Sequence, residues 1–398
     1  MIYYPHECSP CHDGRLCILS ELEKTREAAS TFACPGCGGR AVFDPESQNL
    51  KCPYCGSESP VEKIIEQPQE YDINTAPNED QKDWGVGVRV IRCQGCGAET
   101  VLEKNATAEL CAFCGSPYVL DDQSEAGIAP ESVIPFQTTQ AQAVSSFRKW
   151  LKKRWFAPSN AKRMATLGKI AGVYLPHWTY DAETTSVYTG QAGHYYYVTV
   201  PVTVTRDGKQ VTEMRQERRT RWTPTSGIVH NDFDDVLVAG SRRLEEHLLT
   251  RVRPYDLQKL CRYQAGFLSG FISEKPSVNL KEGWGVAQEK IDDAMRGLAR
   301  EDILRRADEA QVLSLRSEHR NVRYKLTLLP MWLSSFTFKE KAYHVLINGQ
   351  TGKAGGQAPV SPWRVLIAVL IGLAIAGGLY LLFSQGEGRN AASFISNF

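Results

Sequence analysis

Several features are scarce or missing in this chain of 398 residues, and each absence narrows what the protein can be. Its 46 Lys and Arg residues are balanced by 45 Asp and Glu residues, so the net charge is close to zero, although this balance hides strong local asymmetry. Residues 1–30 contain no apolar segment, so no secretory signal peptide is predicted. Of the twelve cysteines only Cys261 lies beyond residue 115, and the close pairing of the others indicates metal ligation in a reducing compartment rather than disulfides.

The recognised motifs of catalysis are also absent. The stretch NGQTGKAGG (348–356) is not a phosphate-binding loop, because only two residues separate its first two glycines and alanine follows its lysine. The aspartates of HNDFDDV (230–236) do not have the spacing of a calcium loop. No His-Glu-x-x-His or Gly-x-Ser-x-Gly pattern occurs. The sequence therefore nominates no catalytic residue and predicts a protein that is not an enzyme.

What the sequence does contain is a repeated module of four cysteines. CPGCGGRAVFDPESQNLKCPYCG (34–56) and CQGCGAETVLEKNATAELCAFCG (93–115) each carry two Cys-x-x-Cys pairs separated by fourteen residues. Four thiolates form the tetrahedral site that structural Zn²⁺ prefers, and a glycine after each pair permits a sharp turn. The pattern predicts two zinc ribbons with one structural ion each. The predicted ligands are Cys34, Cys37, Cys52 and Cys55 in the first module and Cys93, Cys96, Cys111 and Cys114 in the second.

The first 30 residues allow three interpretations. CSPCH (8–12) matches the attachment string of a c-type haem, but haem attachment requires export. Alternatively, Cys8 and Cys11 form part of a third metal-binding turn together with Cys17 or a histidine. The third interpretation is a disordered leader, which the sequence favours.

The charge around the cysteine modules indicates what they bind. Residues 31–120 contain seven Lys and Arg residues against thirteen Asp and Glu residues, and each zinc with four thiolates adds about two negative charges. Such a surface repels phosphate, whereas nucleic-acid-binding modules present a basic face. A role in binding proteins is favoured over a role in binding nucleic acid.

The chain closes with an apolar segment long enough to cross a membrane. Residues 365–383 contain no charge and span about 28 Å as a helix, close to the ~30 Å hydrocarbon core. Trp363 precedes it and Tyr380 lies near its other end, as interfacial anchors would. Small residues recur at every fourth position of this segment: Ala368, Gly372 and Ala376. Such a stripe can pack against a partner helix, so a homo-oligomer is one expectation. We expect a single-pass anchor in the cytoplasmic membrane, with the N-terminal body in the cytosol.

Between the modules and the anchor, a basic helix is predicted at 141–156. Its apolar stripe consists of Val144, Phe147, Trp150, Leu151 and Trp155. From Ser132 to Tyr180 the chain has eight Lys and Arg residues and no acidic residue. The stripe favours a surface helix that docks its aromatic side chains into the core. The two alternatives are that the helix contacts an anionic membrane surface and that it binds RNA.

The rest of the middle region alternates between strand and helix patterns. A hairpin is predicted around RDGK (206–209), with helices at 241–260 and 285–308 and strands at 311–349. A Leu-Pro-x-Trp motif occurs twice, at 175–178 and 329–332. Each copy is followed by Gly-Gln-x-Gly, which predicts a glycine turn. The region is therefore predicted to be a pseudo-symmetric, antiparallel α+β domain.

These patterns divide the chain and carry a resemblance to a known family. We expect a leader (1–30), zinc ribbon 1 (31–60), an acidic linker (61–88), zinc ribbon 2 (89–120), an α+β domain (130–358), a transmembrane helix (363–384) and a tail (385–398). The stretches FACPGCGGRAVFDPESQNLKCPYCG, KRWFAPSNAK, GVYLPHWTYDAETTSVYTGQAG and YHVLINGQTGKAGGQAP resemble a family of bacterial membrane-anchored double zinc-ribbon proteins, often loosely labelled primosomal protein N′ or helicase-like.

The resemblance covers residues 32 to about 385, and residues 1–30 depart from the family pattern. It implies structural zinc at the eight cysteines, no catalysis, and membrane-stress partners of the phage-shock or SPFH type. The leading hypothesis is thus a non-enzymatic, membrane-tethered adaptor that binds protein partners. The alternative is a zinc-ribbon protein that binds nucleic acid in replication or transcription.

Overall fold

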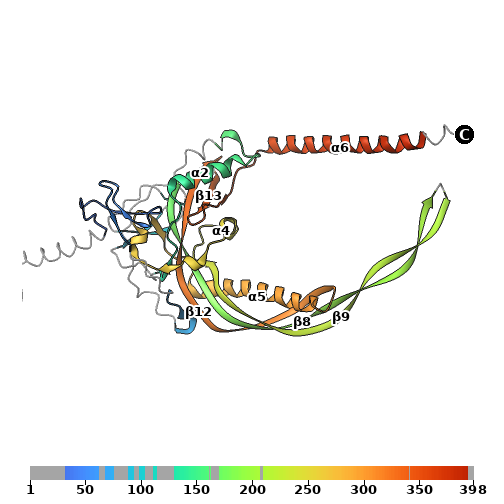
Figure 1. Cartoon of the computed structure of the whole chain (residues 1–398), viewed down its shortest axis with the longest axis horizontal. Coiled ribbons are helices and arrows are strands. Elements are labelled where there is room, and N and C mark those ends of the chain that lie inside the picture. The colour runs from blue at the N-terminus through green and yellow to red at the C-terminus, as the bar shows by residue number, and fades with distance from the viewer. Residues whose placement is uncertain are drawn as a thin grey trace, which may run out of the picture.

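The computed structural model shows a mixed α/β protein with a cluster of four cysteines near its N-terminus and an apolar helix at its C-terminus (Figure 1). The described residues form four α-helices, a small three-stranded sheet and one large sheet. The structure describes residues 32–61, 68–75, 88–93, 98–103, 111–113, 130–160, 162, 170–206, 209–339 and 341–392. The leader with Cys8, Cys11 and Cys17 therefore lies outside the described residues.

The small sheet belongs to the first cysteine module. Its strands are β1 (Val42–Asp44), β2 (Asn49–Lys51) and β3 (Glu58–Ser59), which pair in that order. Phe43 and Leu50 are buried and packed on the main core, with the Phe43 ring 5.3 Å from that of Phe267 in an edge-to-face contact. Backbone bonds reinforce the contact, because the amide of Phe43 donates to the carbonyl of Ser269. The first module is thus seated on the body.

The large sheet contains the remaining eleven strands of the described chain. Its main path runs β10-β7-β12-β8-β11-β6-β5, with β9 paired to β8, β4 and β13 paired to β12, and β14 paired to β13. The strands are β4 (Tyr71–Asp72), β5 (Val88–Arg92), β6 (Glu99–Glu103), β7 (Ser132–Val133), β8 (Ile170–Arg206), β9 (Lys209–Ala239), β10 (Cys261–Arg262), β11 (Ile272–Glu274), β12 (Glu309–Phe338), β13 (Lys341–Asn348) and β14 (Ala354–Gly356).

Strands β8, β9 and β12 are much longer than ordinary strands and form a curved ribbon (Figure 1). β12 pairs with β8 only as far as Gly193, opposite Glu309. Beyond that point β8 and β9 continue as a two-stranded ribbon for thirteen residue pairs, from His194↔Arg221 to Arg206↔Lys209. At about 3.3 Å per residue this free ribbon extends roughly 40 Å past the three-stranded part. The predicted hairpin is present, and its Asp-Gly turn lies outside the described residues.

The two Leu-Pro-x-Trp motifs lie side by side on neighbouring strands. Leu175 of β8 pairs with Leu329 of β12 in antiparallel register, so the two copies are related by an approximate two-fold axis through this pair. β8 continues into a hairpin with β9, and β12 continues into a hairpin with β13. The internal repeat inferred from the sequence therefore corresponds to a local two-fold arrangement in the sheet.

The two glycine motifs after these copies differ from each other. Gly352 has φ +73° in the tight turn between β13 and β14, as predicted for a glycine turn. Gly190 and Gly193 instead lie inside the continuous strand β8, so the predicted turn there is wrong. A Cβ at Gly190 would lie 2.4 Å from the carbonyl oxygen of Gln311, so glycine is needed for close packing between strands rather than for a turn.

Helix α5 (Leu280–Leu304) covers part of the ribbon (Figure 1). Its buried residues recur at intervals of three or four, as expected for one apolar face, and they are Leu280, Gly283, Ala287, Ile291, Met295, Ala299 and Ile303. Asn279 caps the helix by accepting from the amide of Glu282. The shorter helix α4 (Glu246–Val252) buries Leu248, Leu249 and Val252. The remaining turns of 3-10 helix are η1 (Ile73–Thr75), η2 (Leu257–Lys259) and η3 (Ala265–Leu268).

The basic helix α2 (Gln140–Lys152) starts at a capping box formed by Thr139 and Gln142. Phe147 and Trp150 are buried, as the core-docking interpretation requires. Trp155 lies beyond the end of the helix and is 81% exposed, so its assignment to the buried stripe is wrong.

Helix α6 (Pro362–Ala392) leaves the body as a long rod (Figure 1). Its segment Pro362–Leu379 has a mean hydropathy of 1.9 and none of it is buried within the chain. By its length and composition, this helix is long enough and apolar enough to cross a membrane.

Candidate metal centre and charge cluster

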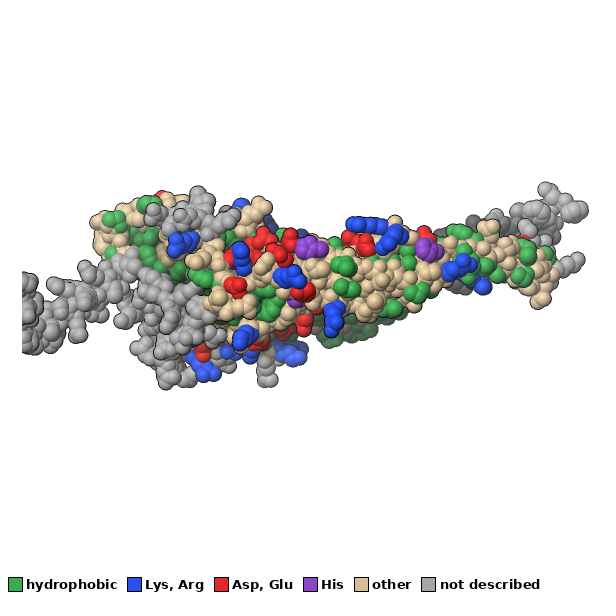
Figure 2. Space-filling view, turned by 90° about the horizontal axis from the view of Figure 1, so that it is seen from below, with side chains coloured by type: hydrophobic (Ala, Val, Ile, Leu, Met, Phe, Trp, Pro, Cys, Tyr) green, Lys and Arg blue, Asp and Glu red, His purple; other side chains and the backbone are tan. Residues whose placement is uncertain are grey.

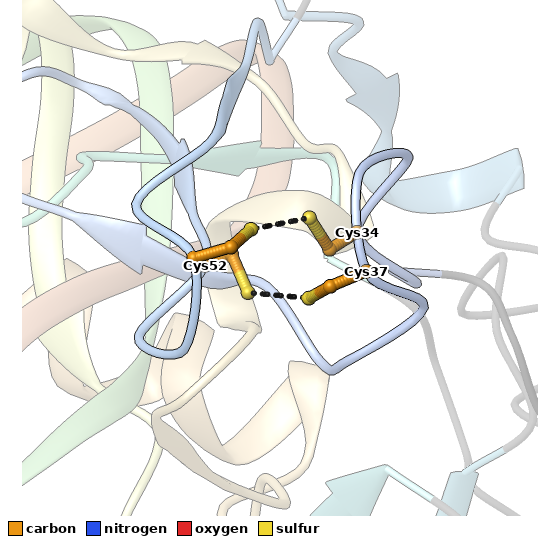
Figure 3. A group of neighbouring side chains, drawn as sticks. Cys34, Cys37 and Cys52 are labelled. Atoms are coloured by element: carbon orange, nitrogen blue, oxygen red, sulfur yellow. Dashed lines mark hydrogen bonds between the residues drawn. The ribbon is translucent and has the colours of Figure 1, made fainter.

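The four cysteines of the first module converge on one point, although their pairs are separated by the β1–β2 hairpin (Figure 3). All four sulfur atoms lie within 4.8 Å of one another. The Sγ atoms of Cys34 and Cys55 are 3.4 Å apart, and those of Cys37 and Cys52 are 3.5 Å apart. A tetrahedral site with Zn–S bonds of about 2.3 Å implies sulfur–sulfur distances near 3.8 Å. The cluster could therefore hold a metal ion with little movement.

The backbone of each Cys-x-x-Cys turn positions its thiols in the same way. In the first pair the amide of Cys34 donates to the carbonyl of Gly39, and in the second the amide of Cys52 donates to the carbonyl of Ser57. The glycine after each pair has positive φ, +71° at Gly38 and +76° at Gly56. This is the conformation predicted for these glycines from the sequence, because a side chain would be strained there.

The thiols of this cluster differ in acidity. The Ser57 hydroxyl, 3.2 Å from the sulfur, lowers the pKa of Cys55 to about 6. The backbone amide of Cys37 lowers the pKa of Cys34. At Cys37 the Gly39 backbone acts to lower the pKa, but the neighbouring thiols of Cys55 and Cys52 raise it to about 12. Four thiolates at this distance repel one another, so a bound cation is what would hold all four deprotonated.

The second cysteine module is only partly described, and its described part is built into the large sheet. Strands β5 and β6 pair with each other, and β6 joins β11, which runs parallel to β8. Cys93 and Cys111 are both buried, in a cluster with side chains of the body such as Val173 and Leu248. Cys96 and Cys114 lie outside the described residues.

The second module contains one backbone hydrogen bond of the kind that closes both turns of the first. The amide of Cys93 donates to the carbonyl of Ala98, five residues later, over 2.8 Å. The same bond between residues five apart occurs at Cys34 and at Cys52. Cys93 therefore begins a turn with the same closing hydrogen bond as both turns of the four-cysteine cluster.

A cluster of carboxylates around the buried Lys325 was not anticipated from the sequence. Lys325 of β12 is 4% exposed, and its Nζ lies 2.7 Å from Asp235 Oδ1 and 3.0 Å from Glu70 Oε1. Asp181 accepts a bond of 2.7 Å from the backbone amide of Asp235. One carboxylate oxygen from each of Glu70, Asp181 and Asp234 lies within 4.8 Å of the others. Glu70, Asp234, Asp235 and Lys325 border a cavity of about 980 Å³, and Lys325 supplies the positive charge that offsets the carboxylates.

The cluster sits where the long strands are irregular. β8 shifts register between Tyr180 and Ala182, and β12 shifts between Arg320 and Arg323. Asp235 of β9 has φ +54°. Burial raises the pKa of Asp181 to about 7, and the nearby Glu70 acts in the same direction. The ion pairs thus lie at aligned bulges across three strands, at the start of the curved ribbon.

Two sets of threonine, histidine and aspartate resemble the hydrogen-bond pattern of hydrolase triads. His230 lies 3.0 Å from Thr185 and 3.1 Å from Asp232. His319 lies 3.1 Å from Thr184 and 3.9 Å from Asp292. None of these six residues borders the cavity beside Lys325. The threonine and histidine of each set face each other across paired strands, His230 opposite Thr185 and His319 opposite Thr184, so cross-strand pairing explains the pattern.

Taken together, these features define a mixed α/β protein with a four-cysteine centre that could hold a metal ion and one helix able to span a membrane. The chain is similar to uncharacterized protein YdjG of Bacillus subtilis (strain 168), with 28% identity over 363 residues. The match covers 88% of this chain and 95% of that relative. No protein-family model matches the chain, and no solved structure matches it.

Proposed function

We propose that this protein is a non-enzymatic adaptor that α6 tethers to the inner face of the cytoplasmic membrane, with two zinc ribbons and a cytosolic body that binds protein partners. The observation that carries the proposal is that the 18-residue apolar window of α6 is entirely unburied within the chain. Leaving so much apolar surface in water is unfavourable, and insertion into a bilayer would remove it from water.

Zinc is the proposed metal at both modules. Four thiolates in a closed set suit structural Zn²⁺. The second site would consist of Cys93, Cys96, Cys111 and Cys114; it is supported by the shared spacing and by the Cys93–Ala98 bond that repeats the geometry of the first module. Each ion would contribute folding free energy to a module that has little core of its own.

The free ribbon of β8 and β9 (194–206 and 209–221) is the proposed partner-binding element. In the described chain it pairs with no third strand. Such an edge presents unpaired backbone groups that another chain can meet. Figure 2 shows basic and hydrophobic side chains continuing along the projecting ribbon. Partners of the phage-shock or SPFH type, which the family resemblance implies, are the first to test.

Membrane insertion places a geometrical requirement on the molecule. The free ribbon and α6 leave the body on the same side (Figure 1). A two-stranded ribbon with charged side chains and unpaired edges cannot lie in hydrocarbon. The ribbon must therefore bend away from the bilayer around α6, and the part free to do so is the two-stranded part, which pairs with no third strand in the described chain.

Cell fractionation tests the tether. The full chain is compared with a variant that ends at residue 361, before α6. We expect the full chain to resist alkaline extraction from membranes and the shortened chain to be soluble. An identical distribution of the two chains would contradict the tether. Co-purification from detergent extracts, with and without residues 196–219, then tests whether the ribbon captures partners.

A specific feature favours nucleic-acid binding as the second candidate function. The free ribbon interleaves tyrosines with arginines: the Arg218 guanidinium lies 4.3 Å from the centre of the Tyr195 ring, and that of Arg221 lies 5.1 Å from that of Tyr196. Aromatic and basic side chains together suit single-stranded nucleic acid. This function predicts retention on DNA that falls steeply with salt and is lost in Arg218→Gln with Arg221→Gln.

A further inference from the structure

The base of α6 is joined to the turn that follows α2. The amide of Ser361 donates to the carbonyl of Phe156 over 2.8 Å. The Arg364 guanidinium donates to the carbonyls of Trp155 and Ala157 and to the hydroxyl of Ser159, over 3.0, 2.7 and 2.8 Å. These bonds hold the turn at the level of the first residues of α6.

Large apolar side chains are exposed at this level. Trp155 is 81% exposed, Trp363 is 67% exposed and Val360 is 62% exposed. Tryptophan at the end of a membrane-spanning segment prefers the headgroup region, where its ring is shielded and its N–H stays hydrated. Since the carbonyl of Trp155 is bonded to Arg364 in the first turn of α6, Trp155 and Trp363 would meet the same layer of the bilayer.

Trp155 and Val360 line a cavity of about 440 Å³ with an amphipathic lining. Its charged side chains are all basic; they are Lys153, Arg154 and Arg251. Its apolar side includes Trp155, Phe156, Pro359 and Val360. A phosphate-sized anion with an attached acyl chain matches such a lining, because cations can pair with the phosphate while the chain continues along α6.

We infer that this cavity binds the headgroup of an anionic phospholipid from the membrane in which α6 lies. The inference rests on the proposed tether and adds a lipid-selective site to it. The occupant is a lipid rather than a soluble anion because the apolar lining ends at the exposed Val360, two residues before α6 begins with its exposed apolar side chains. Two further basic residues, Lys149 and Lys152, lie in the last turn of α2, directly before the cavity residues Lys153 and Arg154.

Native mass spectrometry of the full chain in detergent tests the site. Wild type is titrated with phosphatidylglycerol and with phosphatidylcholine of the same acyl chains. We expect one phosphatidylglycerol to bind at least about fivefold more tightly than phosphatidylcholine, since each nearby cation favours anionic lipid. Inorganic phosphate should not displace it. Equal affinity for the two lipids, or displacement by phosphate alone, would overturn the inference without any variant being needed.

Two variants locate the binding. Lys153→Gln with Arg154→Gln removes two positive charges from the cavity, and we expect it to lose the lipid preference. Lys281→Gln with Arg296→Gln removes two exposed charges from α5 and should keep it. Alkaline extraction of the wild-type chain separates the two proposals: a wild-type chain that stays in the membrane without preferring phosphatidylglycerol contradicts only the lipid site, whereas a wild-type chain that is released contradicts the tether.

Discussion

The ammonium group of Lys325 lies 2.7 Å from Asp235 Oδ1, and the side chains are 5% and 19% exposed. A salt bridge this deep differs from one on the surface, because removing one partner leaves the other charge buried and unpaired. The pair joins β12 to β9, and Glu70 joins the segment between the two cysteine modules to the same point.

Lys325→Met should therefore destabilise the protein strongly. We expect a loss of about 3–5 kcal/mol in the free energy of unfolding. The matched control is Arg320→Met on the same strand. Arg320 pairs with Glu318, and the two side chains are 71% and 65% exposed. Its loss should lower the free energy of unfolding by less than about 0.5 kcal/mol. Urea unfolding of both variants measures the difference. Similar midpoints for the two would show that the buried cluster contributes no more than a surface pair.

Glu274 makes stability depend on pH. It is 1% exposed and accepts one bond of 2.7 Å from the Ser241 hydroxyl, and burial raises its pKa to about 7. The folded state thus holds a proton that the unfolded state has lost above about pH 4.5. The raised pKa therefore contributes on the order of 3 kcal/mol to the free energy of unfolding. This contribution is fully present below about pH 4.5 and is lost as the pH rises through about 7.

Glu274→Gln should remove this dependence. The amide cannot ionise, so at pH 8 the variant should be more stable than wild type, and its stability should change less between pH 4.5 and 8. Thermal unfolding across this range checks the result. A wild-type curve that rises through pH 7, with a parallel curve for the variant, would contradict the assignment.

The two cysteine modules should respond differently to loss of a ligand. Cys52→Ser affects β1–β3, which pair only with each other. Cys93→Ser affects strands that belong to the large sheet. We expect hydrogen exchange to rise mainly in residues 32–61 for the first variant, and to rise also in β11 and α4 for the second. A response confined to residues 88–113 in Cys93→Ser would show that the second module is independent of the body.

The free ribbon and α6 should meet different surroundings in the membrane. A photo-crosslinking amino acid placed at Thr199 should react with protein or water, and one placed at Ile371 should react with lipid. Both experiments use the full chain in proteoliposomes. Lipid adducts at Thr199 would contradict the requirement that the ribbon bends away from the bilayer.

The parts of the structure that could be predicted from sequence are those with local rules. The first four-cysteine cluster follows from spacing and glycine chemistry, and α6 follows from an uninterrupted apolar segment. The capped, amphipathic helix α2 follows from its periodicity, apart from Trp155 beyond its end. These features depend on residues close together in the chain.

The features that escaped prediction depend on distant residues. The Lys325 cluster draws its carboxylates from positions 70, 181 and 235, and no spacing rule connects them. Gly190 resembles a turn glycine in the sequence, but glycine is required there because the backbone of Gln311 lies too close to leave room for a side chain. The join between β6 and β11 brings together segments about 170 residues apart, so the attachment of the second module to the sheet could not be foreseen.

Metal analysis of the full chain extracted with detergent from washed membranes tests the central claim most directly. We expect two zinc ions per chain in material recovered from the membrane fraction. A chain found only in the soluble fraction, or membrane material with one zinc or none, would contradict it.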